Sequence, residues 1–134
     1  MPQIALPRFV ADISGVVSEA AGRVESPRHG GADGDMRVIV FGHLGDGNLH
    51  VNVTGVLDRT GGGNETAERV EAAVLRLVVG HHGSISAEHG IGTAKRAYLS
   101  LQRSPAELAA FAAIRRAFDP DGICNPHVLV VPTP

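Results

Sequence analysis

An Asp-Gly dipeptide between two apolar runs constrains the fold of this chain more than any other feature. Residues 36–55 read MRVIVFGHLGDGNLHVNVTG, and both runs are rich in β-branched residues. Asp-Gly between such runs is among the strongest short-range signals for a β-hairpin, because both residues tolerate the positive φ of a two-residue turn. We therefore predict a hairpin whose turn is Asp46-Gly47.

This turn would place His43 directly opposite His50. Opposed residues on one face have Cβ atoms about 4.5–5.5 Å apart, and two imidazoles at that spacing can bind one ion through bonds of about 2.1 Å. Period-two alternation predicts an apolar face that packs on helices and a polar face that points away from them. The apolar face would hold Val38, Val40, Leu44, Leu49, Val51 and Val53, and the other Phe41, His43, His50, Asn52 and Thr54.

The sequence around the hairpin predicts helices and two further short strands. Apolar residues at three-to-four spacing indicate amphipathic helices, and Pro and Gly mark where elements end. In chain order we predict a strand at 3–7, a helix at 9–20 and a loop at 26–35. A Gly-rich loop at 61–64 then leads into a helix that ends near Gly80, and a strand follows at 84–89.

Helical structure is predicted again after residues 90–92, and the last helix has a well-defined start. Ser104 is a suitable N-cap, Pro105 suits the first helical position, and Glu107 completes a capping box. We expect this helix to run to about Phe118, a turn at 119–122, and an extended tail at 123–132.

The order of elements is typical of an α+β fold. Strand, helix, two strands, helix and strand match a ferredoxin-like split βαβ domain, an antiparallel sheet with helices on one face, here with extra C-terminal helices. A chain of 134 residues suffices for one core, so we expect a single domain over 1–134.

The composition of the chain argues against several classes of partner and favours one cellular location. The net charge is −2, which offers no broad attraction for nucleic acid or anionic lipid. No segment approaches the run of about 20 apolar residues that a membrane span requires, so no span is expected. Cys124 is the single cysteine, which excludes an intrachain disulfide and fits a cytoplasmic location. We expect Cys124 to be buried as a small hydrophobe rather than to bind a metal.

Glu88 lies at the end of the strand predicted at 84–89 and is a candidate third ligand beside His43 and His50. Two imidazoles and one carboxylate leave coordination positions open, as in catalytic metal sites. Zinc is the first choice, and iron and manganese accept the same ligands. The alternative is that the two histidines form a polar surface pair without a metal.

Three motifs resemble a known family. They are GHLGDGNLHVNV at 42–53, SISAEHGIGTAK at 84–95 and DPDGICNP at 119–126. In order and spacing they are similar to the C-terminal region of FAD-linked oxidases of the vanillyl-alcohol-oxidase superfamily. The branch resembled contains D-2-hydroxyglutarate dehydrogenase, D-lactate dehydrogenase and the glycolate oxidase flavoprotein subunit. The resemblance extends from about Ile4 to Pro132.

The resemblance implies a role for each motif residue. His43, His50 and Glu88 would hold a divalent metal, commonly zinc, beside the flavin. Asn52 would contact the substrate carboxylate or hydroxyl, and Asn125 would lie near the flavin. His89 would contact the substrate and act as the base that takes the hydroxyl proton; a capping or metal-supporting role for His89 is the alternative.

The resemblance also implies a function that needs a partner. We expect the substrate- and metal-binding C-terminal domain of an FAD-dependent oxidoreductase that oxidises a D-2-hydroxy acid to the 2-oxo acid. Nothing in the chain resembles the FAD-binding domain, which would be supplied by the same polypeptide or another subunit, so the isolated chain should be inactive. One alternative is a free-standing ferredoxin-like module that binds a metal or a small acid without redox activity. Another is a domain that serves only as an interaction surface.

Overall fold

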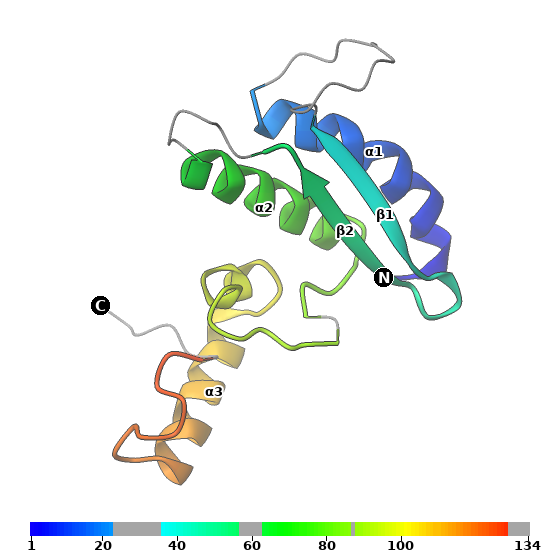
Figure 1. The fold of residues 1–134 in the computed structure, drawn as a ribbon. Coiled ribbons are helices and arrows are strands. Elements are labelled where there is room, and N and C mark those ends of the chain that lie inside the picture. The colour runs from blue at the N-terminus through cyan, green and yellow to red at the C-terminus, as the bar shows by residue number, and fades with distance from the viewer. Residues whose placement is uncertain (23–35, 57–62, 87, 129–134) are drawn as a thin grey trace. The chain divides into compact units, whose positions relative to one another are not determined.

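The computed structural model describes residues 1–22, 36–56, 63–86 and 88–128, so the loop predicted at 26–35 lies outside the described residues. The chain divides into two compact units, Met1–Gly83 and Ser84–Pro134. Unit 1 contains the hairpin and the first two long helices, and unit 2 contains the last helix (Figure 1). Each unit is described by itself.

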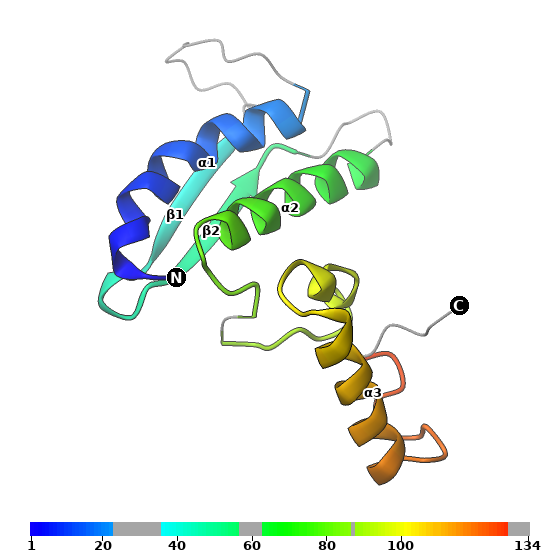
Figure 2. The same cartoon turned by 180° about the vertical axis from the view of Figure 1, so that it is seen from behind.

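Unit 1 is a two-layer structure with two helices on one face of a hairpin. Strands β1 (Arg37–His43) and β2 (Asn48–Thr54) pair antiparallel, and the short 3-10 helix η2 (Leu44–Asp46) lies between them. Helices α1 (Leu6–Ala20) and α2 (Gly63–Gly80) lie side by side on one face of this sheet (Figure 2). The predicted antiparallel sheet with helices on one face is therefore confirmed.

The core of unit 1 forms because both helices carry an apolar stripe. In α1 the buried side chains are Leu6, Phe9, Ile13 and Val17, at the three-to-four spacing of one helical face. Burial of each large side chain contributes about 1.5–3 kcal/mol. The stripe of α2 and the inner face of the hairpin pack on the same cluster through Val70, Val74, Leu77, Val78, Val38, Val40, Leu49, Val51 and Val53.

The strand predicted at 3–7 is wrong. Gln3–Ala5 forms a 3-10 helix, η1, and α1 begins directly after it at Leu6. Pro7 lies in the first turn of α1, where its missing N–H costs no helical hydrogen bond and its fixed φ already suits a helix. Pro7 therefore lies at the start of a helix rather than at the end of a strand.

Residues 84–89 were also predicted as a strand, and the described residues of this segment do not form one. Ser84–Ser86 is irregular, and Glu88 and His89 lie in a turn. The α+β class is confirmed, but the four-stranded ferredoxin-like sheet is not, since β1 and β2 alone form the sheet within the described parts of the chain.

Unit 2 is built on helix α3 (Pro105–Phe118), preceded by the 3-10 helix η3 (Arg96–Leu101). The predicted capping box is confirmed: the Glu107 N–H donates to Ser104 Oγ at 3.3 Å, and the Ser104 N–H donates to Glu107 Oε2 at 2.8 Å. The Ser104 N–H, the Ser104 hydroxyl, which donates to Glu107 Oε2 at 2.9 Å, and the Arg103 guanidinium lower the pKa of Glu107. The start of α3 is thus fixed as the sequence predicts.

The segment after α3 folds back in two turns. The Gly122 N–H donates to the Asp119 carbonyl at 3.2 Å, which confirms the turn predicted at 119–122. The Val128 N–H donates to the Asn125 carbonyl at 3.1 Å. Residues 123–128 are therefore not the extended tail we expected, and the rest of that tail lies outside the described residues. Among the helices that the structure describes, none has the length and apolarity needed to span a membrane.

Candidate functional site

The hairpin has a longer turn than predicted. His43 pairs with Asn48, and His50 pairs with Phe41, so the direct opposition of His43 and His50 is wrong. Residues 44–46 coil into η2, and Gly47, at φ +65°, closes the turn by donating its N–H to the Leu44 carbonyl at 3.2 Å. Asp46 and Gly47 are thus the last two residues of a four-residue connection between the strands, not a two-residue turn.

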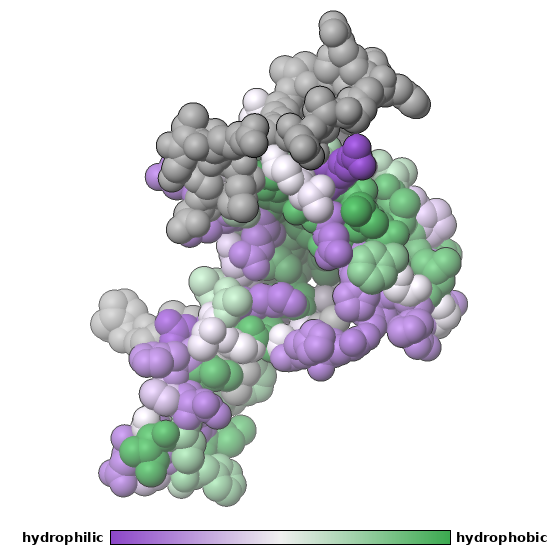
Figure 3. Space-filling view, in the orientation of Figure 1, coloured by the Kyte–Doolittle hydropathy of each residue, from purple (hydrophilic) through white to green (hydrophobic). Residues whose placement is uncertain are grey.

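The two faces of the hairpin nevertheless come out as predicted. The pairing differs from the expected one by two residues, and because side chains alternate with period two, a shift of two keeps every side chain on its face. The valines and Leu49 pack on the core, whereas Leu44 lies in the turn and is 63% exposed. The outer face carries hydrophobic and hydrophilic side chains together (Figure 3).

On this outer face His43 and His50 are diagonal neighbours. Diagonal positions in an antiparallel pair are about 7–8 Å apart, still within reach of long side chains. His43 is exposed, and His50 is half-buried with its ring stacked on Phe41 at a centroid distance of 5.1 Å and an angle of 13°. Asn52 is exposed on the same face. The hairpin therefore presents two imidazoles and an amide together.

The second motif forms an anchored loop with an exposed tip in unit 2. Ile85 is buried, its N–H donates to Gln102 Oε1 at 3.0 Å, and its carbonyl accepts from Lys95 Nζ at 2.9 Å. Glu88 and His89 lie at the exposed turn of this loop. Lys95 is half-buried and holds the loop through this hydrogen bond.

The third motif ends in a tight loop that exposes Asn125. Asn125 has φ +45°, in the left-handed region that non-glycine residues seldom adopt. Its neighbour Cys124 is exposed, not buried as we expected.

No group of three or more His, Cys, Asp or Glu side chains that could hold a metal occurs among the described residues. His43 and His50 belong to unit 1 and Glu88 to unit 2. The ligand set His43, His50 and Glu88 therefore stays a prediction.

Comparison with known proteins assigns the chain to a family. The family model described as "FAD linked oxidases, C-terminal domain" matches residues 2–129. The chain belongs to this family. The family match confirms the resemblance drawn from the three motifs, and it spans both units.

Relatives of this FAD-linked oxidase C-terminal domain include two dehydrogenases. The D-2-hydroxyglutarate dehydrogenase of Stutzerimonas stutzeri is 39% identical over 123 residues, 90% of this chain and 24% of the relative. The mitochondrial D-2-hydroxyglutarate dehydrogenase of Arabidopsis thaliana is 35% identical, over 88% of this chain and 19% of the relative. No solved structure matches the chain.

A third relative is the glycolate oxidase subunit GlcD of Escherichia coli, which is 41% identical over 69% of this chain and 18% of the relative. The chain thus spans a quarter or less of the length of these curated relatives. It is similar to one part of each.

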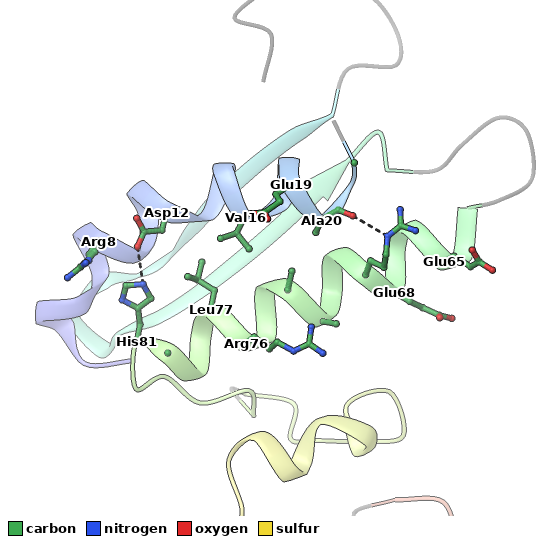
Figure 4. A pocket seen from close by; sticks show the side chains of 15 residues that line it. Arg8, Asp12, Val16, Glu19, Ala20, Glu65, Glu68, Arg76, Leu77 and His81 are labelled. Carbon is green, nitrogen blue, oxygen red and sulfur yellow. Dashed lines mark hydrogen bonds and ion pairs between the residues drawn. The ribbon is translucent and has the colours of Figure 1, made fainter. Parts of the chain in front are cut away.

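The FAD-linked oxidase C-terminal domain also has an open groove between α1 and α2, with a volume of about 1400 Å³. The groove lies on the side of the helices that faces away from the hairpin (Figure 4), and none of the predicted site residues lines it. At one end His81 Nε2 lies 3.3 Å from Asp12 Oδ2, and its ring meets Phe9 edge-on. His81, directly after α2, thus joins the end of α2 to α1.

Proposed function

We propose that this chain is the substrate-side domain of an FAD-dependent oxidoreductase that oxidises a D-2-hydroxy acid to the 2-oxo acid. The family match over residues 2–129 and the relatives that carry dehydrogenase and oxidase names support this proposal. The FAD-binding domain would come from the rest of the same polypeptide or from another subunit. The single-domain organisation and the cytoplasmic location stay predictions.

The observation that carries the proposal is the outer face of the hairpin. His43, His50 and Asn52 share one side of β1 and β2, while the other side is closed by the core of unit 1. Polar side chains on a rigid, two-stranded support are suited to hold a small acid in a fixed orientation. Phe41 and Ile39 on the same face, each about half exposed, would exclude water around it.

The proposed site on this face would include a divalent metal. Imidazole nitrogens bind zinc, iron and manganese, and diagonal positions allow both rings to turn toward one ion. His43 and His50 would hold it, with Glu88 as the carboxylate ligand that the family pattern implies. Bound there, such an ion would polarise the substrate's 2-hydroxyl oxygen and make its proton easier to remove.

The remaining roles divide between proton transfer and orientation. His89 would accept the proton of the 2-hydroxyl group as the O–H and C2–H bonds break and the C=O bond forms. Histidine suits this task because its reference pKa is about 6.5. Asn52 would hydrogen-bond the substrate, and Asn125 would contact the flavin. Bound FAD would supply the acceptor for the hydride that leaves C2.

The metal-binding part is tested by titrating the purified chain with zinc and by measuring its metal content. We expect one equivalent of zinc to bind, and His43→Ala or His50→Ala to weaken binding at least tenfold, because each removes one of few ligands. His127→Ala is the matched control, since it removes an exposed imidazole outside the motifs. Equal zinc affinity in all three variants would show that the hairpin histidines are not ligands.

The catalytic part is tested in the flavoprotein that contains this chain. D-2-hydroxy acids should bleach its flavin absorbance while the L-enantiomers do not. His89→Ala should lower kcat by about 10²–10⁴-fold, the usual contribution of a general base. If the chain binds zinc but no flavoprotein contains it or associates with it, the alternative of a free-standing metal-binding module is favoured.

A further inference from the structure

The loop after α3 is tied together by one guanidinium group. Arg115, in the last turn of α3, donates from Nη1 to the Val128 carbonyl at 2.9 Å and from Nη2 to the Asn125 carbonyl at 2.8 Å. Its Nη2 also donates to the Cys124 carbonyl. Three backbone carbonyls of residues 124–128 therefore converge on one side chain.

The carboxylate of Asp119, which is opposite in charge to the guanidinium, completes the arrangement. Its carboxylate lies 3.5 Å from Arg115 Nη2, and its two oxygens accept from the N–H groups of Ile123 at 2.9 Å and Cys124 at 3.0 Å. The Asp119 side chain is 8% exposed and that of Arg115 is 22% exposed. The pair is thus largely shielded from water. Hydrogen bonds between charged groups are stronger in such surroundings than in water.

The backbone conformation of Asn125 depends on such support. A non-glycine residue at φ +45° is disfavoured and persists only where its surroundings determine it. The carbonyls that Arg115 binds are those of Asn125 itself, the residue before it and a residue three positions later. Arg115 is therefore hydrogen-bonded to the carbonyls on both sides of the Asn125 Cα, the non-glycine residue of this loop with a positive φ.

We propose that Arg115 is a positioning residue that fixes the direction of the exposed Asn125 side chain. This inference rests on the proposed function, in which Asn125 contacts the flavin. Arg115 makes no contact with the reacting atoms; it sets the backbone that presents the amide. Asp119 holds the guanidinium in place, and it also holds the N–H groups of Ile123 and Cys124, which precede Asn125.

The chemistry of this clamp requires arginine. A guanidinium presents five N–H donors in a rigid planar fork, whereas a lysine ammonium is a point charge that cannot span three carbonyls with fixed geometry. Arg115→Lys keeps the charge next to Asp119 and loses most of the fork. Arg116, the next residue, is exposed and offers a matched control with the same side chain.

The first experiment measures amide hydrogen exchange in the chain itself. Arg115→Ala should accelerate exchange at the Ile123, Cys124 and Val128 amides, whose N–H groups are hydrogen-bonded within the loop, while the middle of α3 stays protected. Arg116→Ala should leave all of these unchanged. Unchanged exchange at 123–128 in Arg115→Ala would overturn the clamp, whatever the function of the protein.

The second experiment is a double-mutant cycle in the flavoprotein that contains this chain, read by FAD affinity, the flavin absorbance spectrum and kcat. Misplacing a contacting group by about 1 Å can cost about 10²-fold, so we expect a loss of that order in Arg115→Ala. The double variant with Asn125→Ala should be no worse than Asn125→Ala alone. Arg115→Lys should recover part of the loss, and added guanidinium should partly restore Arg115→Ala.

Two results would contradict the inference in distinguishable ways. Losses that multiply independently in the double variant, without guanidinium rescue, would show that Arg115 does not act through Asn125. Absence of FAD binding in the unaltered protein or complex that contains this chain would contradict the proposed function, and the flavin-facing role of Asn125 with it. The exchange experiment would still report on the clamp itself.

Discussion

Two glycines determine how the hairpin turns. Gly42, at φ +147°, pairs with Leu49, and a Cβ on Gly42 would lie 2.3 Å from the Asn48 carbonyl oxygen. Gly47 closes the turn at φ +65°, where a Cβ would meet the Met1 backbone. Gly45, between them, has open space around it. The position of His43 on the outer face therefore depends on Gly42, its neighbour in β1.

We predict that Gly42→Ala destabilises unit 1 by at least about 1–3 kcal/mol, from the disfavoured φ alone. The clash with the Asn48 carbonyl adds to this cost. Chemical denaturation measures the change, and Gly45→Ala should stay within about 0.5 kcal/mol of the unaltered chain. Equal stabilities of the two variants would show that the turn does not need Gly42.

At the scale of elements, the capping box at the start of α3 gives stability that depends on pH. Hydrogen bonds from Ser104 hold the pKa of Glu107 below its ordinary value. A carboxyl whose folded pKa is depressed stabilises the fold above the unfolded pKa, about 4.3 for glutamate. That stabilisation is lost as the pH falls through the lower, folded pKa.

We predict that Ser104→Ala costs about 1 kcal/mol at neutral pH, as loss of an N-cap usually does. It should also raise the pKa of Glu107 part of the way toward the ordinary value, because the hydrogen bond from the Ser104 hydroxyl is removed while the one from the backbone N–H of residue 104 can remain. NMR titration of the Glu107 carboxyl and thermal melts across acidic pH measure both effects. Ser100→Ala, at an exposed serine in η3, is the control. An unchanged pKa of Glu107 in Ser104→Ala would show that the Ser104 side chain does not lower it.

The capping box and the two faces of the hairpin could be predicted from sequence because both depend on local spacing. Alternation places Val38 and His43 on opposite faces of β1 whatever the turn length, and His50 shares the face of His43 provided that the register shifts by an even number. The turn itself could not be predicted, because Gly42 and the coiling of residues 44–46 compete with the two-residue Asp-Gly turn.

The strand predicted at 84–89 failed for a different reason. Its conformation is set by contacts distant in sequence, since Ile85 is held by Gln102 and Lys95. The Arg115 clamp was likewise missed, because a single arginine at the end of a helix is usually a solvated charge. Basic residues in the last turn that precede a DPDG turn were the signal that could have indicated it.

At the scale of the whole molecule, the residues that we propose for the site are divided between the two compact units. His43, His50 and Asn52 belong to unit 1, and His89 and Asn125 belong to unit 2. The chain also spans a quarter or less of the length of its relatives. The relatives therefore contain most of their sequence outside the region that this chain matches.

We predict that the purified 134-residue chain is colourless and does not oxidise D-2-hydroxy acids, because the family's flavin is expected to be held mainly outside this region. Absorbance spectroscopy of the purified chain and dye-linked activity measurements check this. A yellow, active preparation would overturn the expectation that a separate FAD-binding domain is required.

The stacked rings of Phe41 and His50 give the hairpin an internal spectroscopic reporter. Protons held over the face of an aromatic ring are magnetically shielded, so the imidazole resonances of His50 should move when the rings separate. Because the two residues belong to different strands, those resonances report on strand pairing itself. Binding of a ligand to this surface can therefore be measured from the chemical shifts of the His50 imidazole without an added label.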